Sequence, residues 1–339
     1  MISRKAYRMP KAGSLAHLKL VQEEIPEPQD HEISIEVKAI GLNFADIFAM
    51  QGLYSATPKG SFVPGLEYSG VIHKCGKQVK DFKVGDKVMG VTRFGGYASR
   101  LNIDQRYIRP LPDSWSFEQG AAFLVQVLTA FYALKELGNI QSGQTVLIHS
   151  AAGGVGLLAN RIAKRFNAYT IGTVGSTAKV DLLNKEGYDK VIVRGEDFRE
   201  QLKTSLAGRE LNLVLECIGG QVFKDSYEEM APMGRLISYG SASFATHGSR
   251  PNMLKLLWKY LRRPKVDPMK MPTDNKSVMG FNLIWLYEKA DIMEKLLREI
   301  DDLQLDPPLV GHQFSFEELP AAIRLFQSGR TVGKVVVSV

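Results

Sequence analysis

Cysteine is scarce in this sequence: a chain of 339 residues has two, Cys75 and Cys217. A disulfide-stabilised fold needs a denser framework of cysteines, and free thiols suit a reducing compartment. A signal peptide is not expected either, because the basic first ten residues precede no apolar run. We therefore expect a soluble, cytoplasmic protein.

Long apolar runs are also missing. The most apolar stretch, 120–134, is interrupted by Gln126 and Thr129 and is closed by Lys135. A membrane-spanning helix needs about 20 predominantly apolar residues. We therefore expect this stretch to be too short and too polar to cross a bilayer.

Metal-binding patterns are not evident in the sequence. The six histidines are scattered without the spacing of a metal site, and His73 and Cys75 could at most share one face of a strand. There is also no Gly-x-Ser-x-Gly motif that would present a nucleophilic serine. Hydrolytic and metal-dependent chemistries therefore find little support.

Positive charge is present in excess, with a formal net charge of +7, but it is concentrated in one segment. Residues 250–276 hold eight Lys or Arg side chains against Asp267 and Asp274. Within them, 253–263 has the spacing of a short basic amphipathic helix. It could contact lipid headgroups or RNA. We favour a solvated insertion that packs Leu256, Leu257 and Tyr260 inward.

The chain divides into two parts with different patterns of predicted secondary structure. The first hundred residues are rich in short strands between Gly and Pro turns, including 32–38, 68–73 and 87–91. A helical stretch at 117–137 follows, and strands and helices then alternate. This pattern predicts an α/β fold with a doubly wound parallel sheet. The strand candidates of that sheet are 145–150, 169–174, 190–193, 211–217 and 235–239, and a helix is expected at 155–166.

The last six residues, 334–339, again have the composition of a strand. We expect this strand to return to the N-terminal β-rich part, which would make that domain discontinuous in sequence.

A glycine-rich turn follows the predicted strand 145–150. Residues 151–156 match G-x-G-x-x-G, with Ala151 in the place of the first glycine and a predicted helix after them. Such a turn lets the backbone and the helix N-terminus approach a diphosphate. A simple tight turn is the alternative. The predicted cofactor-binding residues here are Ala152, Gly153, Gly154, Val155 and Gly156.

The end of the next strand indicates which dinucleotide binds. An NAD-binding site places Asp or Glu there for the ribose 2′-hydroxyl, but residues 171–179 contain no carboxylate. Ser176 and Lys179 could instead bind a 2′-phosphate, with Arg194 as a second cation. The sequence therefore predicts NADPH, unless Lys179 is an ordinary helix-start lysine.

Several further motifs carry a family resemblance. Residues 39–46, 51–54, 64–70 and 85–88, taken with 151–156, resemble zinc-independent quinone oxidoreductases of the medium-chain dehydrogenase/reductase family, such as zeta-crystallin. Residues 42–46, 51–54 and 280–283 look like the vesicle amine transport protein homologues of that group. The resemblance covers nearly the whole chain.

This resemblance implies two domains with an active-site cleft between them, and usually a homodimer. The expected GroES-like β-domain comprises 1–124 and 306–339, and the expected Rossmann domain 125–305, with a basic insertion around 245–276. Zinc-dependent relatives carry a cysteine near Asn43 and a histidine at Leu66. Leucine cannot bind a metal and an asparagine amide is a poor zinc ligand, so no metal is expected.

Site residues are also implied by the resemblance. Asn43 and Thr129 would lie near the nicotinamide and Tyr54 in the substrate cleft, although Asn43 could be a helix cap and Tyr54 a packing residue. Relatives often have Tyr at the place of Arg194, which weakens the phosphate role of that residue. The remaining residues expected around the cofactor are Ile218, Tyr239, Gly240, Ser241, Phe281, Asn282 and Lys334.

The function expected from these features is hydride transfer from NADPH to a small-molecule quinone or α,β-unsaturated carbonyl. Tyr54 and Asn43 are candidate donors to the developing oxyanion, and water could supply the proton, since no residue is a firm general acid. One alternative is an NADPH-binding protein with little turnover that acts at membranes or on RNA. Another is an enoyl-thioester reductase.

Overall fold

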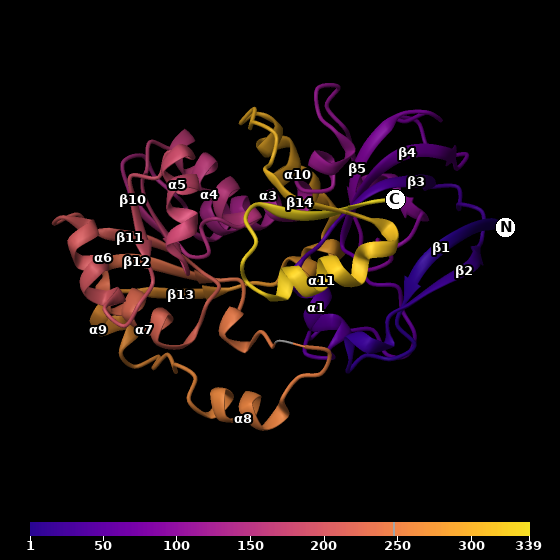
Figure 1. Ribbon diagram of the computed structural model, residues 1–339. Helices are drawn as coiled ribbons and strands as arrows, with labels where there is room; N and C mark the ends of the chain where they lie inside the picture. Colours follow the sequence, from indigo (N-terminus) through magenta and orange to yellow (C-terminus); the bar gives the residue numbers. More distant parts are fainter. Residues whose placement is uncertain (247) are drawn as a thin grey trace.

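The computed structural model describes residues 1–246 and 248–339. It has two lobes, each built on its own sheet, that meet near the middle of the molecule (Figure 1). His247, which falls in the predicted basic insertion, lies outside the described residues.

The sheet of one lobe is parallel, in the order β10-β9-β8-β11-β12-β13. The direction of winding reverses between β8 and β11, which confirms the predicted doubly wound fold. The five predicted strands are present, four of them with shifts of at most two residues at their ends; β12 begins five residues before the predicted 235–239, and β13 is additional. The strands are β8 (Thr145–Ile148), β9 (Tyr169–Val174), β10 (Lys190–Val193), β11 (Leu211–Glu216), β12 (Met230–Ser238) and β13 (Ser277–Gly280).

Both faces of this sheet are apolar, because its strands are apolar at successive positions. On β8, Val146 and Ile148 join the core shared with the other lobe, whereas Leu147 joins a second cluster on the opposite face. Each face therefore needs helices over it. The first face is covered by α4 (Gly154–Arg165) and by α5 (Val180–Lys185), which follows η4 (Thr177–Lys179), and the second by α6 (Phe198–Leu206) and α7 (Gly220–Glu229).

The sheet of the other lobe is mainly antiparallel, and the C-terminus completes it. Strand β15 pairs with β3 and with β14, as predicted for the tail. A separate hairpin of β1 (Ile2–Arg8) and β2 (Lys19–Ile25) packs beside it. The strands of the larger sheet are β3 (Glu32–Gly41), β4 (Glu67–Cys75), β5 (Lys87–Val91), β6 (Arg100–Asp104), β7 (Ile108–Pro110), β14 (Val310–Ser315) and β15 (Lys334–Ser338).

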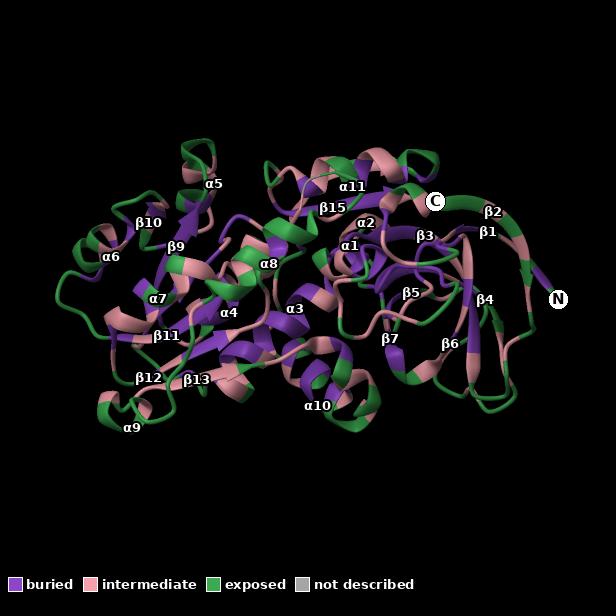
Figure 2. Ribbon diagram, turned by 90° about the horizontal axis from the view of Figure 1, so that it is seen from below, coloured by how far each residue is buried: buried purple, intermediate pink, exposed green. Residues whose placement is uncertain are grey.

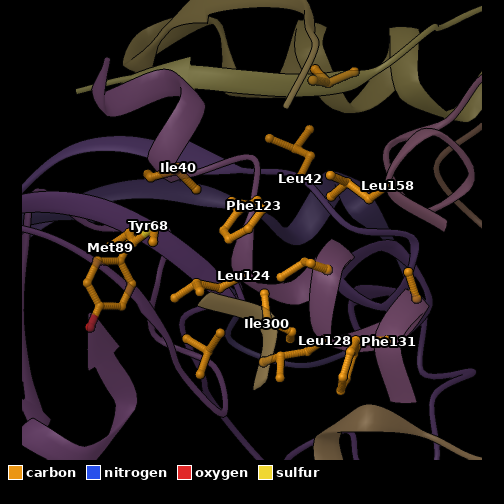
Figure 3. Packing of buried hydrophobic residues seen from close by; sticks show 14 of the residues in the cluster. Ile40, Leu42, Tyr68, Met89, Phe123, Leu124, Leu128, Phe131, Leu158 and Ile300 are labelled. Atoms are coloured by element: carbon orange, nitrogen blue, oxygen red, sulfur yellow. The ribbon is translucent and has the colours of Figure 1, made fainter. Parts of the chain in front are cut away.

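The apolar segment between the lobes is an interrupted helix, made of α2 (Phe117–Gly120), α3 (Leu124–Phe131) and a π-helical turn, η3 (Tyr132–Leu137). The expectation that it is too short and too polar to cross a bilayer was wrong, because 21 residues with a mean hydropathy of 1.3 satisfy the length and composition of a span. However, 72% of its most apolar window is buried in the fold. Leu128 and Phe131 lie in one core cluster with Leu158 and Ile300 (Figure 3). This segment is a core element that joins the two lobes.

Residues 241–276, called the strap below, connect β12 to β13 outside the sheet. They contain η5 (Ala242–Phe244), α8 (Met253–Leu261) and α9 (Met271–Asp274). The predicted basic helix is thus present, two residues shorter than expected. Seen from below, α8 lies in front of the junction between the lobes (Figure 2).

The remaining elements surround that junction. Tyr107 and Tyr287 stack with ring centroids 3.9 Å apart, so the segment after β13 also packs on the β-rich lobe. The domain boundaries at 124/125 and 305/306 stay a prediction. These elements are η1 (Leu15–His17), α1 (Phe44–Met50), η2 (Gln105–Tyr107), η6 (Leu283–Glu288), α10 (Ala290–Asp301), η7 (Phe316–Glu318) and α11 (Leu319–Gln327).

Candidate active site between the two lobes

A cleft of about 1150 Å³ lies between the lobes. One wall is formed by α1 and the residues around it, and the other by the turns at the carboxyl ends of β8, β9, β11 and β12. This edge of a doubly wound sheet, at the point where the winding reverses, is where such folds bind ligands.

The turn after β8 brings bare backbone to the cleft. Gly153 is the N-cap of α4. A β-carbon on Gly156 would lie 2.6 Å from Cα of Ala151, and one on Gly154 would lie 2.8 Å from Oε1 of Gln126. Close packing against backbone therefore requires glycine at position 156, whereas at position 154 the neighbour is the end of the Gln126 side chain. The free amides at the start of α4 are then available to a diphosphate.

The C-terminal strand meets the same turn. The backbone N–H of Gly333 donates to the carbonyl oxygen of Ala152 at 2.7 Å, and Gly153 forms a parallel bridge with Gly333. The glycine-rich turn of one lobe is thus held by the entry to β15 of the other.

Two cations line the cleft near the carboxyl ends of β9 and β10. Nζ of Lys179 donates to the carbonyl oxygens of Gly329 and Thr331 at 2.8 Å each, and Nη1 of Arg194 donates to Oγ1 of Thr173 at 2.7 Å. Burial, and secondarily the charge of Arg194, lower the pKa of Lys179. No ion pair within residues 1–246 and 248–339 includes either side chain. Glu216 is near enough to act on the pKa of Arg194 but forms no ion pair with it, so the two neighbouring cations suit an anionic group.

Ser176 stands apart from this pair. Its Oγ accepts a hydrogen bond from the backbone N–H of Ala178 at 3.3 Å, as the cap of η4. Ser176 is exposed and does not line the cleft. In this conformation its hydroxyl serves the local turn.

A buried polar network lies at the centre of the cleft. Oδ1 of Asn43 accepts from Nζ of Lys334 at 2.8 Å and from Nε2 of Gln126 at 2.6 Å. Nδ2 of Asn43 donates to Oε1 of Glu67 at 3.0 Å, and Lys334 pairs with the same carboxylate. Oε2 of Glu67 accepts from the backbone N–H of Val125 at 3.1 Å. Because every partner is fixed, the Asn43 amide has one defined orientation.

A second buried carboxylate supports this network from behind. Oδ2 of Asp46 accepts from the backbone N–H of Asn43 at 2.8 Å and from the hydroxyl of Tyr97 at 3.0 Å. Burial is the largest influence on this group and raises the pKa of Asp46 to about 7. The predicted capping role of Asn43 is thus confirmed in part: Asn43 starts α1, and Asp46 returns a hydrogen bond to it.

Tyr54 and Thr129 face the same space. The hydroxyl of Tyr54 donates to Oδ1 of Asn282 at 2.6 Å, and burial raises the pKa of Tyr54 to about 12. The phenol is therefore a neutral donor at physiological pH. The hydroxyl of Thr129 donates within its own helix, to the carbonyl oxygen of Val125 at 2.7 Å.

The floor of the cleft follows β11 and β12. Oε1 of the buried Glu216 accepts from the backbone N–H groups of Ile218 and Gly219 at 2.7 Å each, which fixes the loop after β11. Phe281 packs between aromatic neighbours, with its ring centroid 5.0 Å from that of Tyr132 and 6.2 Å from that of Tyr239. This part of the cleft is lined by aromatic side chains.

The structure brings nearly all the predicted site residues to this one cleft. Ser176 alone of the predicted set does not line it. Sequence reasoning missed Gln126 and gave no role to Glu67 or Asp46. Gln126 could have been recognised as a polar residue inside the most apolar stretch. Glu67 could have been recognised as a carboxylate that directly follows Leu66. The predicted residues lining the cleft are Asn43, Tyr54, Thr129, Ala152, Gly153, Gly154, Val155, Gly156, Lys179, Arg194, Ile218, Tyr239, Gly240, Ser241, Phe281, Asn282 and Lys334.

The inward-packing expectation for the strap helix was only partly right. Leu256 is buried, but Leu257 and Tyr260 are 55% and 52% exposed although they line the cleft. A helix that lies across an open cleft gains less burial than one packed on a closed core.

Asn43 and Leu66 stand where the resemblance places zinc ligands in zinc-dependent relatives. Both side chains line the cleft. Among the described residues, no three His, Cys, Asp or Glu side chains are grouped to hold a metal ion. The cleft wall here is an amide network and a leucine.

Comparison with known proteins agrees with this geometry. Residues 29–113 match the alcohol dehydrogenase GroES-like domain and residues 154–282 the zinc-binding dehydrogenase family. Quinone oxidoreductase of Salmonella typhimurium is 37% identical over 262 residues, which is 76% of this chain and 79% of that protein. The zebrafish (Danio rerio) synaptic vesicle membrane protein VAT-1 homolog is 31% identical over 96% of this chain and 68% of its own length.

A solved structure extends the likeness to the whole fold. Escherichia coli quinone oxidoreductase complexed with NADPH superposes with a TM-score of 0.85 at 28% identity, covering 100% of both chains. Together, fold and cleft define an oxidoreductase of the medium-chain dehydrogenase/reductase class. The chain belongs to its zinc-independent, quinone oxidoreductase-like group and is close to the VAT-1 homologues.

Proposed function

We propose that the chain is an NADPH-dependent reductase of a quinone or an α,β-unsaturated carbonyl. The observation that carries the coenzyme assignment is the pair Lys179 and Arg194, which line the cleft without a carboxylate partner among the described residues. Family membership supports a nicotinamide coenzyme in general. The cation pair favours the one with a 2′-phosphate.

The residues present fit such a coenzyme along its length. The start of α4 would hold the diphosphate, and the floor formed by Ile218, Tyr239 and Phe281 would support the nicotinamide. When bound, the coenzyme supplies a hydride to the electron-poor carbon of the acceptor. The acceptor's carbonyl oxygen then gains a proton, for which solvent is the proposed source.

The chain's own contribution is to orient the acceptor and stabilise its oxygen. Tyr54 is a neutral hydrogen-bond donor at the cleft wall. During the reaction its hydroxyl would donate to the developing oxyanion instead of to Asn282. The amide of Asn43 is held by hydrogen bonds with Lys334, Glu67 and Gln126. It would present a fixed polar group beside the nicotinamide ring. Neither role requires a metal ligand.

Coenzyme discrimination tests the proposal directly. Replacing both cations (Lys179→Ala with Arg194→Ala) should raise the Kd for NADPH roughly 100- to 10,000-fold, since each of the two charge-assisted bonds contributes about 1.5–3 kcal/mol. The Kd for NADH should change little, and both values come from calorimetry. Lys185→Ala, an exposed lysine of α5, is the matched control. Stronger binding of NADH than of NADPH by the unaltered chain would refute the assignment.

The acceptor class needs a separate measurement. NADPH oxidation should be fastest with quinones or simple enones in a panel that also contains enoyl thioesters of CoA. A clear preference for the thioesters would make the chain an enoyl-thioester reductase. Tight NADPH binding with no turnover of any acceptor would favour the low-turnover alternative. A homodimer and a cytoplasmic location also remain predictions.

A further inference from the structure

Three polar side chains are completely buried on the second face of the parallel sheet. They are His149, Thr173 and Ser226, and none of them lines the cleft. Two positions before His149 and Thr173, the strands carry Leu147 and Ile171, which belong to the apolar cluster on that face. Side chains of a strand alternate between faces, so His149 and Thr173 continue an apolar row with polar groups. Buried polar groups of this kind need hydrogen-bond partners.

The partners form a row across the carboxyl ends of three neighbouring strands. Leu147 of β8 is paired with Ile171 of β9, so two residues later His149 stands opposite Thr173. On the other side of Thr173 lies the end of β10, which Arg194 directly follows. Arg194 lines the cleft, so this row connects the cleft with the interior of the lobe.

The hydrogen bonds along the row run in one direction. Nη1 of Arg194 donates to Oγ1 of Thr173 at 2.7 Å, because a guanidinium has no acceptor. At the other end, the hydroxyl of Ser226 donates to the carbonyl oxygen of Val222 at 2.7 Å. Oγ of Ser226 therefore accepts from Nε2 of His149, at 3.0 Å. Nδ1 of His149 then accepts from the hydroxyl of Thr173, and these atoms are 2.8 Å apart.

The environment of His149 maintains this order. Burial, and secondarily the charge of Arg194, lower the pKa of His149 to about 3, so the ring is neutral at physiological pH. The ring also packs beside Phe198, with centroids 5.7 Å apart. Since the only hydrogen of the Thr173 hydroxyl points to His149, the lone pairs of its oxygen are left for Arg194.

Anchoring at Nη1 leaves the rest of the Arg194 guanidinium available to a ligand. Within residues 1–246 and 248–339, its bond to Thr173 is the only hydrogen bond of this side chain. A β-carbon on Gly175 would lie 3.5 Å from Nη2, and Gly175 lines the cleft at the end of β9. Dinucleotide-binding folds recognise the ribose 2′ position at the end of this strand.

We propose that His149 and Thr173 are positioning residues that orient Arg194 toward the 2′-phosphate of the coenzyme. The inference rests on the proposed function, because it requires that NADPH is the coenzyme. An arginine side chain has many rotamers, and ordering it during binding costs free energy. A guanidinium that is already held in place avoids much of this cost and discriminates better between the phosphorylated and unphosphorylated coenzymes.

The preference for NADPH measures this role, expressed as the Kd for NADH divided by the Kd for NADPH, both from calorimetry. Thr173→Val keeps the shape of the side chain but removes the anchor of Arg194. It should lower the preference about tenfold, which is the order of one charge-assisted hydrogen bond. Thr173→Ser retains the hydroxyl and should keep the preference within about threefold of that of the unaltered chain.

Thr170→Val is the matched control. Thr170 is also completely buried on β9, and its hydroxyl donates to Oδ2 of Asp189 at 3.3 Å, away from the cleft. This variant should leave the preference unchanged. Urea unfolding of Thr170→Val and Thr173→Val shows whether the two substitutions affect the fold to a similar extent.

A second pair of variants tests His149. His149→Leu removes the acceptor of the Thr173 hydroxyl and should lower the preference about fivefold. His149→Asn places an amide oxygen near the position of Nδ1 and should restore most of it. Equal losses in the two variants would show that His149 has no positioning role.

Arg194→Ala tests whether the effect passes through Arg194. In that background the remaining preference comes from Lys179, so adding Thr173→Val should not lower it further. An equal loss from Thr173→Val in both backgrounds, or an equal loss in Thr170→Val, would overturn the inference.

The same measurements separate this inference from the proposed function. A preference for NADPH that neither Thr173→Val nor His149→Leu lowers would overturn the positioning role alone. The expected series of preferences without turnover of any acceptor would support the positioning role and defeat the reductase. A preference of the unaltered chain for NADH would refute both.

Discussion

The side chain at the centre of the cleft that has the most unusual environment is Lys334. It is almost completely buried, and burial lowers the pKa of its ammonium, while Glu67 acts in the opposite direction. Removing one partner of such a pair leaves an uncompensated buried charge. Lys334 and Glu67 are therefore best understood as a unit that orients Asn43.

Tyr54 gives the sharpest residue-level prediction. Tyr54→Phe removes the donor that faces the acceptor, so kcat for a quinone should fall roughly 10- to 1000-fold, with little change in the Kd for NADPH. Because the pKa of Tyr54 is raised to about 12, the unaltered chain should show no loss of activity from ionisation of this phenol up to about pH 10.

Steady-state kinetics with a soluble quinone measures both effects. Tyr107→Phe is a matched control, since that hydroxyl donates to the carbonyl oxygen of Tyr287 at 2.7 Å and does not line the cleft. An unchanged kcat in Tyr54→Phe would assign Tyr54 to packing alone.

The sequence could indicate which residues line the cleft but not which hydrogen bonds connect them. Asn43, Tyr54 and Lys334 were found through motif resemblance and all reach the cleft. Their hydrogen bonds, however, link positions that are far apart in the chain, such as Asn43 with Gln126 and with Lys334. Local pattern carries no information about such pairings. The role of Ser176 was inferred from residue type, and its hydroxyl is instead used in a local cap.

Among elements, α4 depends on a contact with α3, the helix between the lobes. Ala is the better helix former, so Gly154→Ala should not weaken α4 itself. Its β-carbon would nevertheless lie 2.8 Å from Oε1 of Gln126, whose amide is held by Asn43. We expect about tenfold weaker NADPH binding, measured by calorimetry, because either the helix start or the Gln126 amide that is bonded to Asn43 must shift.

Gly280→Ala is the control for this change. Gly280 also lines the cleft, but a β-carbon there meets only the carbonyl oxygen of Ser238, at 3.6 Å. Recovery of binding when Gln126→Ala is added to Gly154→Ala would identify the contact responsible. Equal effects of the two glycine variants would contradict the steric account.

The elements that sequence reasoning found and missed differ in how they are stabilised. Strands β8, β9 and β11 are almost completely buried and consist mostly of apolar residues, and such runs are visible in sequence. Strand β13 has four partly exposed residues and exists through pairing with β12. Strand β2 is highly charged and pairs with β1. Tertiary pairing, not composition, determines both.

At the scale of the whole molecule, one cluster of buried side chains runs through both lobes, with α3 between them (Figure 3). The lobes are therefore expected to unfold together. Stability measured by denaturant then reports on any buried group, including those of the cleft.

Asp46 makes that global stability depend on pH. Its pKa is raised to about 7 in the fold from an ordinary value of 3.8, so the folded chain keeps a proton that the unfolded chain releases between these values. Stability should therefore fall as the pH rises from about 4 to 7, by at most on the order of 4 kcal/mol relative to Asp46→Asn. Urea unfolding at about pH 5 and pH 8 measures the difference.

Asp113→Asn, at an exposed carboxylate, serves as the reference variant. Parallel pH profiles for the unaltered chain and for Asp46→Asn would show that Asp46 is ionised throughout this range. The conclusion that burial dominates its environment would then be wrong.

The return of the chain end through Gly333 into β15 has a consequence for synthesis. Gly333, Lys334 and β15 follow every strand of the parallel sheet in the sequence, so the ribosome releases them after that sheet. A nascent chain without them lacks both the clamp on the glycine-rich turn and the ammonium beside Asn43. We therefore expect coenzyme binding to be acquired only after β15 has left the ribosome.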